Sequence, residues 1–279
     1  MVVDRRSFLM SAGGSVLAGA LSTGALAAAA DRTRFKAIAF DAFPIFDARP
    51  IAALAESLLP GHGAAFMNAW RARQFDYQWL RALAGQYVDF LQATHDSLVF
   101  AARQLQLEVS PAQQAQLMAA WSNLQVWPDV AEAIKVLHGA GLRLVFLSNM
   151  TSRMISGGLK EAKLEDMFEA VISTDRIRSY KPDHRAYQLG LDTLRLRKED
   201  VLFVASTGWD AAGAKWFGYP TFWVNRMSAP PEELGAQADA VGPDLAALVS
   251  FVLPNGPHGQ SVQPGTAHVA GSAQLSAGV

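Results

Sequence analysis

Several stretches of the chain are typical of buried strands that end in polar residues. The first is a nearly uninterrupted apolar run that ends at Phe40, directly before Asp41. Later runs at 144–147, 170–173, 201–204 and 220–224 have the same character. Apolar runs of this kind are typical of parallel strands buried on both faces, and the chemistry of open α/β sheets collects at the carboxyl ends of such strands. Asp41 is therefore the first candidate for a functional residue.

Between the first strand and Trp127 the pattern changes to helical periodicity. No further strand-like run occurs there, and helices are predicted at 51–59, 64–84, 87–107 and 111–124. An insertion of roughly 75 residues is too long for an ordinary loop. The pattern predicts a helical cap at 49–125, inserted into a core domain that is made of 31–48 and 126–253.

After the cap, strands and helices alternate. Helices are predicted at 128–138, 152–162, 183–195 and 210–217, between and beside the four later strands. Alternation at this spacing predicts an α/β fold with a doubly wound parallel sheet and right-handed crossovers. We expect the functional site between the carboxyl edge of that sheet and the cap.

Composition narrows the function further. The chain has 279 residues, of which 51% are hydrophobic, and this is ample for a large core. Its net charge of -1 argues against a nucleic-acid partner. It has no cysteine, which excludes disulfides and thiol catalysis.

The two ends differ from the rest in composition. Arg5 and Arg6, followed by Ser7 and a Gly/Ala-rich apolar stretch, resemble a twin-arginine signal peptide at 1–30, with Ala25-Leu26-Ala27 as the cleavage site. This predicts recognition by the Tat translocon and a periplasmic location; the alternative is an uncleaved membrane anchor. Residues 254–279 hold too few large apolar side chains to offset the cost of ordering them, so a disordered tail is predicted.

Four motifs at the strand ends carry a family resemblance. They are Asp41, Ser148-Asn149, Lys181-Pro182 and Asp210, in that order. Together they resemble the haloacid dehalogenase superfamily, and within it the type II (S)-2-haloacid dehalogenases, over about Phe35 to Val252. Longer phrases add specificity: Trp70-Arg71, Tyr77-Gln-Trp79-Leu-Arg81, Ser179-Tyr-Lys181-Pro182-Asp183, Gly208-Trp209-Asp210 and Asn225-Arg226.

The resemblance implies a reaction and a role for each catalytic residue. Water and an (S)-2-haloacid would give an (R)-2-hydroxyacid and halide. Asp41 would attack the halogen-bearing carbon and form an ester, Lys181 would keep that carboxylate ionised, and Asp210 would orient or deprotonate the water that hydrolyses the ester. Arg71 would reach from the cap to the substrate carboxylate or the departing halide. The alternatives are an ordinary turn or helix-cap role for each Asp and a solvated position for Lys181.

The resemblance also implies a substrate-binding set. Ser148 and Asn149 would hold the substrate carboxylate, although Asn149 or Thr151 is alternatively a helix cap. Tyr187 is counted in the set and would hydrogen-bond within the network of Lys181 and Asp41. An apolar wall and the residues before Asp210 complete the set: Phe43, Phe75, Phe90, Trp209, Ser206 and Thr207.

Position 43 separates the subclasses of the superfamily. Its phosphatases carry a second Asp two residues after the nucleophile, because an alkoxide leaving group needs a proton. Here the residue is Phe43, and halide leaves without protonation. No metal and no cofactor are therefore expected, and a homodimer is expected because family members often form one.

Two departures from the family pattern keep other functions open. The first motif is one residue shorter than usual and lacks its Thr hydroxyl, and Thr207 and Gly208 stand where Asn and a variable residue are usual. The alternatives are a phosphatase of the same superfamily, or an exported anion-binding protein that has lost turnover.

Overall fold

The structure, a computed structural model, describes residues 34–254. The predicted signal peptide lies outside the described residues, and so does the predicted tail from Asn255 onward. Within the described residues no helix is both long and apolar enough to cross a membrane.

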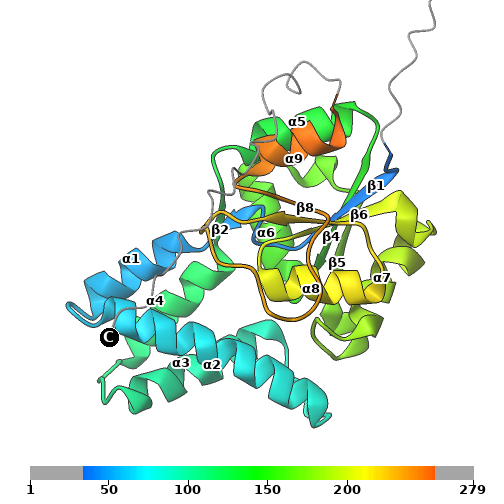
Figure 1. Cartoon of the computed structure of the whole chain (residues 1–279). Helices are drawn as coiled ribbons and strands as arrows, with labels where there is room; N and C mark the ends of the chain where they lie inside the picture. Colours follow the sequence, from blue (N-terminus) through cyan, green and yellow to red (C-terminus); the bar gives the residue numbers. More distant parts are fainter. Residues whose placement is uncertain (1–33, 255–279) are drawn as a thin grey trace, which may run out of the picture. The chain divides into compact units, whose positions relative to one another are not determined.

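The described chain is built around a six-stranded sheet in the order β5-β4-β1-β6-β7-β8, and every neighbouring pair is parallel. β1, which precedes Asp41, lies in the middle (Figure 1). This is the predicted doubly wound α/β sheet. The strands are β1 (Ala37–Phe40), β4 (Arg143–Ser148), β5 (Ala170–Ser173), β6 (Val201–Ala205), β7 (Thr221–Val224) and β8 (Ala240–Gly242).

Helices cover both faces of the sheet because successive strand residues point to opposite sides. Ile38 and Phe40 belong to the apolar cluster under α5 (Val130–Gly139), α6 (Ser152–Ala162) and α9 (Leu245–Val252). Ala37 and Ala39 belong to the cluster under α7 (His184–Leu194) and α8 (Gly208–Phe217). Three 3₁₀ turns lie among these elements: η1 (Glu165–Met167), η2 (Thr174–Ile177) and η3 (Lys198–Asp200).

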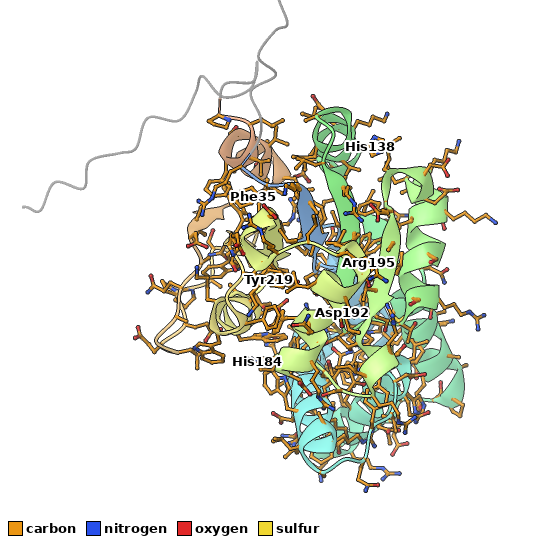
Figure 2. All side chains as sticks on the ribbon, turned by 90° about the vertical axis from the view of Figure 1, so that its right-hand side faces the viewer. Phe35, His138, His184, Asp192, Arg195 and Tyr219 are labelled. Atoms are coloured by element: carbon orange, nitrogen blue, oxygen red, sulfur yellow. The ribbon has the colours of Figure 1, made fainter. Side chains whose placement is uncertain are left out.

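Tyr219 fixes α7 against the second of these clusters. Figure 2 shows Tyr219 beside α7, and its hydroxyl donates a hydrogen bond of 2.9 Å to the carbonyl oxygen of Tyr187. The approach requires Gly190, since a Cβ there would lie 2.6 Å from the Tyr219 oxygen. The side chain of Tyr187 is thereby held under the carboxyl edge of the sheet.

Four helices form the cap: α1 (Arg49–Leu58), α2 (Gly63–Leu83), α3 (Phe90–Gln104) and α4 (Pro111–Ser122). Ser110 starts α4 with a capping box, followed by Pro111 at the first helical position. The buried cap residues Phe66, Trp70 and Trp121 join the same apolar cluster as α5, α6 and α9. The apolar interior therefore continues from the core into the cap.

The prediction that no strand lies between β1 and Trp127 was wrong. β2 (Phe46–Asp47) pairs antiparallel with β3 (Gln125–Val126) at the base of the cap. Two residues are too short to show a period in sequence. β8 and α9 were also not predicted. The predicted helix at 87–107 begins at Phe90, because the side chain of Asp89 accepts a hydrogen bond from Gln92 N and caps it.

Two adjacent glycines of α6 provide a matched test of the packing at this base. A Cβ at Gly158 would lie 2.5 Å from the buried Phe46 ring and 3.1 Å from Leu124 O, whereas a Cβ at Gly157 meets nothing closer than Ser122 O at 4.0 Å. Overpacking costs about 1–3 kcal/mol, and replacing a helical Gly by Ala contributes up to about 1 kcal/mol. We expect Gly158→Ala to lower the free energy of unfolding in urea and Gly157→Ala to raise it. Equal stabilities of the two variants would contradict the close contact at Gly158.

Candidate active site

Asp41 accepts hydrogen bonds from serines at the ends of the two strands beside β1. Asp41 follows β1, Ser148 ends β4, and Ser206 follows β6, so the three side chains meet at the middle of the carboxyl edge. Ser206 Oγ donates to Asp41 Oδ2 at 2.8 Å, and Ser148 Oγ donates to Oδ1 at 3.4 Å. The backbone N–H of Phe43 donates to Oδ2 at 3.3 Å. The carboxylate is thus held in one orientation from both sides.

Lys181 links Asp41 to Asp210. Its Nζ lies 2.9 Å from Asp41 Oδ1 and 2.5 Å from Asp210 Oδ2, and all three side chains are buried. The Tyr187 hydroxyl donates to Asp210 Oδ1 at 2.7 Å. Both oxygens of Asp210 therefore have a partner in the resting structure.

The two carboxylates differ in their pKa values. Burial by itself raises the pKa of Asp41, but the charge of Lys181 and the hydrogen bonds of Lys181, Ser206 and Phe43 outweigh it, so the pKa lies below its ordinary value. Burial raises the pKa of Asp210 to about 6, although Lys181 opposes the shift. Burial alone would lower the pKa of Lys181, but Asp210 and Asp41 hold it above its ordinary value. Asp41 is the more strongly stabilised anion.

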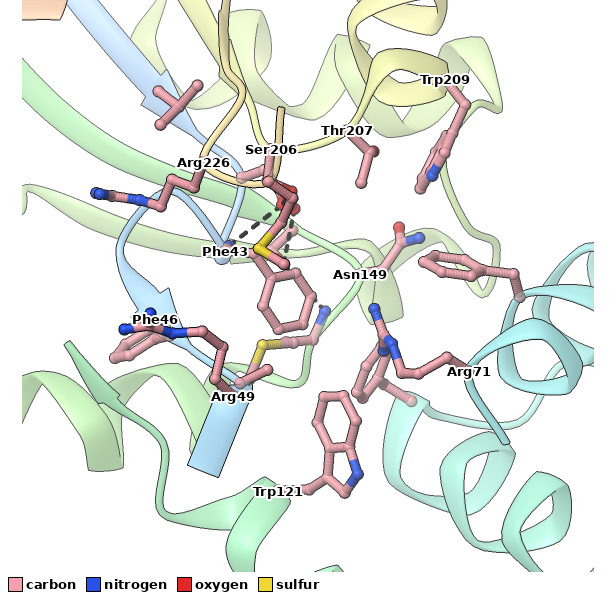
Figure 3. A pocket seen from close by; sticks show the side chains of 18 of the residues that line it. Phe43, Phe46, Arg49, Arg71, Trp121, Asn149, Ser206, Thr207, Trp209 and Arg226 are labelled. Atoms are coloured by element: carbon pink, nitrogen blue, oxygen red, sulfur yellow. Dashed lines mark hydrogen bonds between the residues drawn. The ribbon is translucent and has the colours of Figure 1, made fainter. Parts of the chain in front are cut away.

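A cavity of about 310 Å³ opens over Asp41, between the cap and the carboxyl edge of the sheet (Figure 3). Lys181, Asp210 and Tyr187 do not line it. They form the layer beneath Asp41. Tyr187 was counted among the substrate-binding residues but does not line the cavity, whereas the hydrogen bond predicted for it within the network of Lys181 is present as its bond to Asp210. The predicted residues that line the cavity are Asp41, Phe43, Arg71, Phe75, Phe90, Ser148, Asn149, Ser206, Thr207 and Trp209.

Arg71 brings a positive charge from the cap into this cavity. Figure 3 shows it extending from α2 towards the core. Its guanidinium carbon lies 4.9 Å from the ring centre of Phe75, 5.0 Å from that of Trp121 and 5.5 Å from that of Phe43, and it donates a hydrogen bond to Gln74. Burial lowers the pKa of Arg71 to about 10, and Asp41 opposes the shift, so the group is cationic at neutral pH. The guanidinium is thus a cation held among three aromatic rings at the wall of the cavity.

Asn149 is not a helix cap. Thr151 caps α6, with its hydroxyl accepting a hydrogen bond from Met154 N at 3.3 Å. Asn149 Oδ1 accepts from Lys181 N at 2.9 Å, and Asn149 Nδ2 donates to Gln78 Oε1 at 3.2 Å. Asn149 therefore connects the Lys181 loop to the cap.

Asp210 is likewise not the residue that caps its helix. Thr207 occupies the cap position of α8, and Asp210 lies in the first turn with its side chain turned towards Lys181. The Thr207 hydroxyl is buried without a hydrogen-bond partner among the described residues.

Several cavity residues were not predicted from the sequence. Trp127 lies between two guanidinium groups, with Arg49 4.2 Å and Arg226 4.5 Å from its ring centre. Arg226 and Gln78 stand inside phrases that resemble the family, and this was the only available signal for them. The cavity lining that was not predicted comprises Phe46, Ala48, Arg49, Met67, Gln78, Trp121, Trp127, Met150, Val224, Arg226 and Met227.

The described residues offer no group of side chains suited to bind a metal ion. Within residues 34–254 no cluster of three His, Cys, Asp or Glu side chains could hold a metal ion.

Comparison with known proteins gives a consistent result. The family model of haloacid dehalogenase-like hydrolases matches residues 17–218. An (S)-2-haloacid dehalogenase from Pseudomonas sp. strain YL is 37% identical over 77% of this chain and 94% of its own, and haloacetate dehalogenase H-2 from Moraxella sp. strain B is 35% identical over 78% and 98%.

Solved structures agree with this. A crystal structure of an L-2-haloacid dehalogenase superposes with a TM-score of 0.77 and 38% identity, covering 78% of this chain and 98% of that one. The L-2-haloacid dehalogenase of Xanthobacter autotrophicus with chloropropionic acid covalently bound gives a TM-score of 0.73 and 33% identity, covering 80% and 100%. The chain therefore belongs to the haloacid dehalogenase superfamily, among the (S)-2-haloacid dehalogenases.

Proposed function

We propose that the protein hydrolyses short (S)-2-haloacids to (R)-2-hydroxyacids and halide through an ester on Asp41. The observation that carries the proposal is the placement of Lys181 between Asp41 and Asp210, beneath a cavity with aromatic walls. A carboxylate that is ionised, fixed and open to an apolar cavity is suited to attack carbon. The names of the relatives support the same reaction.

In the first step an oxygen of Asp41 attacks the carbon that bears the halogen. The new C–O bond forms as the carbon–halogen bond breaks, and halide departs with the bonding electrons. Arg71 and the surrounding rings offer an anion site for the halide or for the substrate carboxylate. One in-line attack inverts the configuration at that carbon.

In the second step water attacks the carbonyl carbon of the Asp41 ester, so the inverted carbon keeps its configuration. Ester formation removes the charge of Asp41 and leaves Lys181 paired with Asp210 alone. Asp210 then orients the water or takes its proton, and the water replaces one of the two contacts that the Asp210 oxygens make in the resting enzyme. The bond between that carbonyl carbon and the ester oxygen then breaks, so the departing oxygen leaves as the hydroxyl of the 2-hydroxyacid. The oxygen of the water stays in the regenerated carboxylate of Asp41.

Two other functions remain to be separated from this one. Phe43 stands where a phosphatase would carry its general acid, and magnesium-dependent turnover of p-nitrophenyl phosphate would favour phosphatase activity. An anion-binding protein that has lost turnover would bind haloacid without releasing halide. Halide release from each enantiomer of 2-chloropropionate, with and without chelator, distinguishes all three. We expect release from the (S) enantiomer in both conditions.

For the whole precursor we propose export by the twin-arginine route to the periplasm, followed by removal of the signal. For the mature protein we propose a homodimer, which light scattering at several concentrations would test. Both proposals come from the sequence resemblance.

The first prediction concerns the nucleophile. Asp41→Asn should abolish halide release from (S)-2-chloropropionate, since the amide is nearly isosteric but cannot attack carbon. Asp47→Asn is the matched control, because Asp47 is a buried core carboxylate that binds Arg49 and does not line the cavity. Asp47→Asn should retain turnover. Steady-state halide release by an Asp41→Asn sample that mass spectrometry shows to be free of deamidation would contradict the mechanism.

The second prediction separates the two steps. Asp210→Asn should slow ester hydrolysis more than ester formation, so the peptide that contains Asp41 should gain the mass of the acyloxy group, with about one halide released per site. The double variant with Asp41→Asn should gain no mass. In oxygen-18 water, one turnover of the wild type should label Asp41 and leave the product unlabelled. Label that enters the hydroxyacid in that turnover would mean that water attacks the substrate directly.

Low pH should also slow ester hydrolysis more than ester formation in the wild type, because it protonates Asp210. The pKa of Asp41 lies below its ordinary value, so the first step should persist at about pH 5. The pKa of Asp210 is about 6, and loss of the Asp41 charge in the ester moves it lower. Hydrolysis should therefore fall as the pH drops through a midpoint at or below about 6. Rapid-quench measurement should show a halide burst and a slow steady state at low pH.

Export of the precursor is testable through its arginine pair. Arg5→Lys combined with Arg6→Lys should leave the precursor in the cytoplasm, because the paired guanidinium groups are read by a receptor and charge alone is insufficient. Cell fractionation measures the outcome. Normal periplasmic appearance of the double variant would indicate the general secretory route.

A further inference from the structure

The five residues that follow Asp41 form a buried turn that cannot hold itself in place. Residues 42–46 read Ala-Phe-Pro-Ile-Phe, so none of their side chains can form a hydrogen bond. Ala42, Ile45 and Phe46 are almost fully buried. The N–H groups of Ile45 and Phe46 donate to Ala42 O at 3.1 and 2.9 Å, which closes one turn of backbone. The carbonyl oxygens after Ala42 need donors from elsewhere, because a buried carbonyl without a partner is destabilising.

Two residues outside the turn supply those donors. Trp127 donates through its indole N–H and its backbone N–H, and Arg226 donates through its guanidinium. All four carbonyl oxygens of residues 43–46 accept one of these hydrogen bonds, and the indole hydrogen is shared between the first and the last of them. The pairs are Trp127 Nε1 with Phe43 O (3.2 Å) and Phe46 O (3.0 Å), Trp127 N with Ile45 O (3.0 Å), and Arg226 Nη2 with Pro44 O (2.9 Å).

Phe43 passes this restraint to the nucleophile. Its N–H donates to Asp41 Oδ2 at 3.3 Å, while its carbonyl oxygen accepts the bond from the Trp127 indole. A hydrogen bond weakens steeply as its angle departs from linear, so the N–H would lose its alignment with the carboxylate if the carbonyl end of Phe43 were free to turn. The orientation of Asp41 therefore depends in part on the indole.

The Trp127 ring is itself fixed by two cations. The guanidinium carbons of Arg49 and Arg226 lie 4.2 and 4.5 Å from its ring centre. Arg49 is bound to Asp47 at 2.8 Å. Arg226 is bound to Asp129 at 3.0 Å. Figure 3 shows both arginines on one side of the cavity. The indole is thus a rigid donor at the base of the cap, which the turn precedes and Trp127 follows in the chain.

We infer that Trp127, together with Arg226, is a positioning residue for the nucleophile. The indole N–H anchors the turn and, through Phe43, sets the direction of the Asp41 carboxylate. The inference rests on the proposed function. It also accounts for the first departure from the family pattern, because a turn that is one residue short and has no hydroxyl of its own is anchored from outside. Such a residue acts on the rate of attack at carbon and not on the affinity for the substrate.

The test uses Trp127→Phe, which keeps an aromatic ring beside the two arginines and removes the indole N–H. Halide release from (S)-2-chloropropionate is followed in single turnovers with enzyme in excess, so that only the first step is measured. The maximal rate constant should fall roughly three- to tenfold, as expected for the loss of one hydrogen bond, while the half-saturating enzyme concentration stays nearly constant. An unchanged rate constant in a folded variant, or a change confined to the half-saturating concentration, would overturn the inference.

Trp216→Phe is the matched control, because Trp216 is 47% exposed and does not line the cavity. It should leave both quantities unchanged. Arg226 provides the second test, which decides the matter if Trp127→Phe does not fold. Arg226→Met removes the donor to Pro44 O and should lower the maximal rate constant, and Arg226→Lys, which keeps a cationic donor, should restore most of the loss. Equal rate constants for the Met and Lys variants would contradict the anchoring of the turn.

The inference and the proposed function can fail separately. If the wild type releases no halide from any 2-haloacid, the proposed function fails, and amide hydrogen exchange then tests the anchor. The peptide that holds residues 42–46 should exchange faster in Trp127→Phe than in the wild type, and a peptide from α7 should exchange at the same rate in both. Equal exchange in the turn would refute the anchor. Faster exchange in both peptides would show a general loss of structure and would also refute it.

Discussion

The ammonium of Lys181 between two buried carboxylates is the interaction on which the site depends. Removing either partner of a buried ion pair commonly costs about 3–5 kcal/mol, because the remaining charge is left without compensation. Here the cation is shared, so its two partners compete for it. Asp41 is further stabilised by Ser206 and a backbone N–H, and its pKa is lowered, while that of Asp210 is raised to about 6. The lysine lowers the pKa of both carboxylates, and their unequal other partners separate the two values.

The charges of the site balance only when the cap is included. The core contributes Asp41, Asp210 and Lys181, which together carry one excess negative charge when all are ionised. Arg71 from α2 supplies the missing positive charge. The group of Asp41, Asp210, Lys181 and Arg71 is therefore neutral overall before an anionic substrate enters, while Arg49 and Arg226, which also line the cavity, are paired with Asp47 and Asp129. An incoming carboxylate meets the Arg71 guanidinium, whose protein neighbours are mainly aromatic rings. This arrangement favours a small anion without a metal-type cluster of carboxylates.

Sequence patterns predicted the elements that are long or strongly apolar. The central strands and the motif residues at their ends could be predicted because a buried parallel strand leaves a clear apolar run, and its carboxyl end fixes the position of the next side chain. The β2–β3 ribbon could not be predicted, because a strand of two residues shows no periodicity in the sequence.

The sequence also did not predict which side chains line the cavity and which lie beneath Asp41. Tyr187 was counted with the substrate-binding residues and lies behind Asp210, although the hydrogen bond predicted for it within the network of Lys181 is present as its bond to Asp210. Trp121, Trp127 and Arg226 reach the cavity from three elements, and their meeting depends on how those elements pack.

The cap is joined to the core through the backbone of the Lys181 loop. Trp79 of α2 holds the carbonyl of Lys181, while Asn149, which binds the N–H of the same residue, is itself held by Gln78 of α2. Both backbone groups of the lysine are thus tied, directly or through one side chain, to neighbouring residues of a single cap helix. The cap is consequently not an interchangeable module. A chimera that carries a foreign cap would inherit the sheet and the nucleophile but lose the anchors of its lysine, so the helix that walls the substrate cavity also holds a catalytic residue in place.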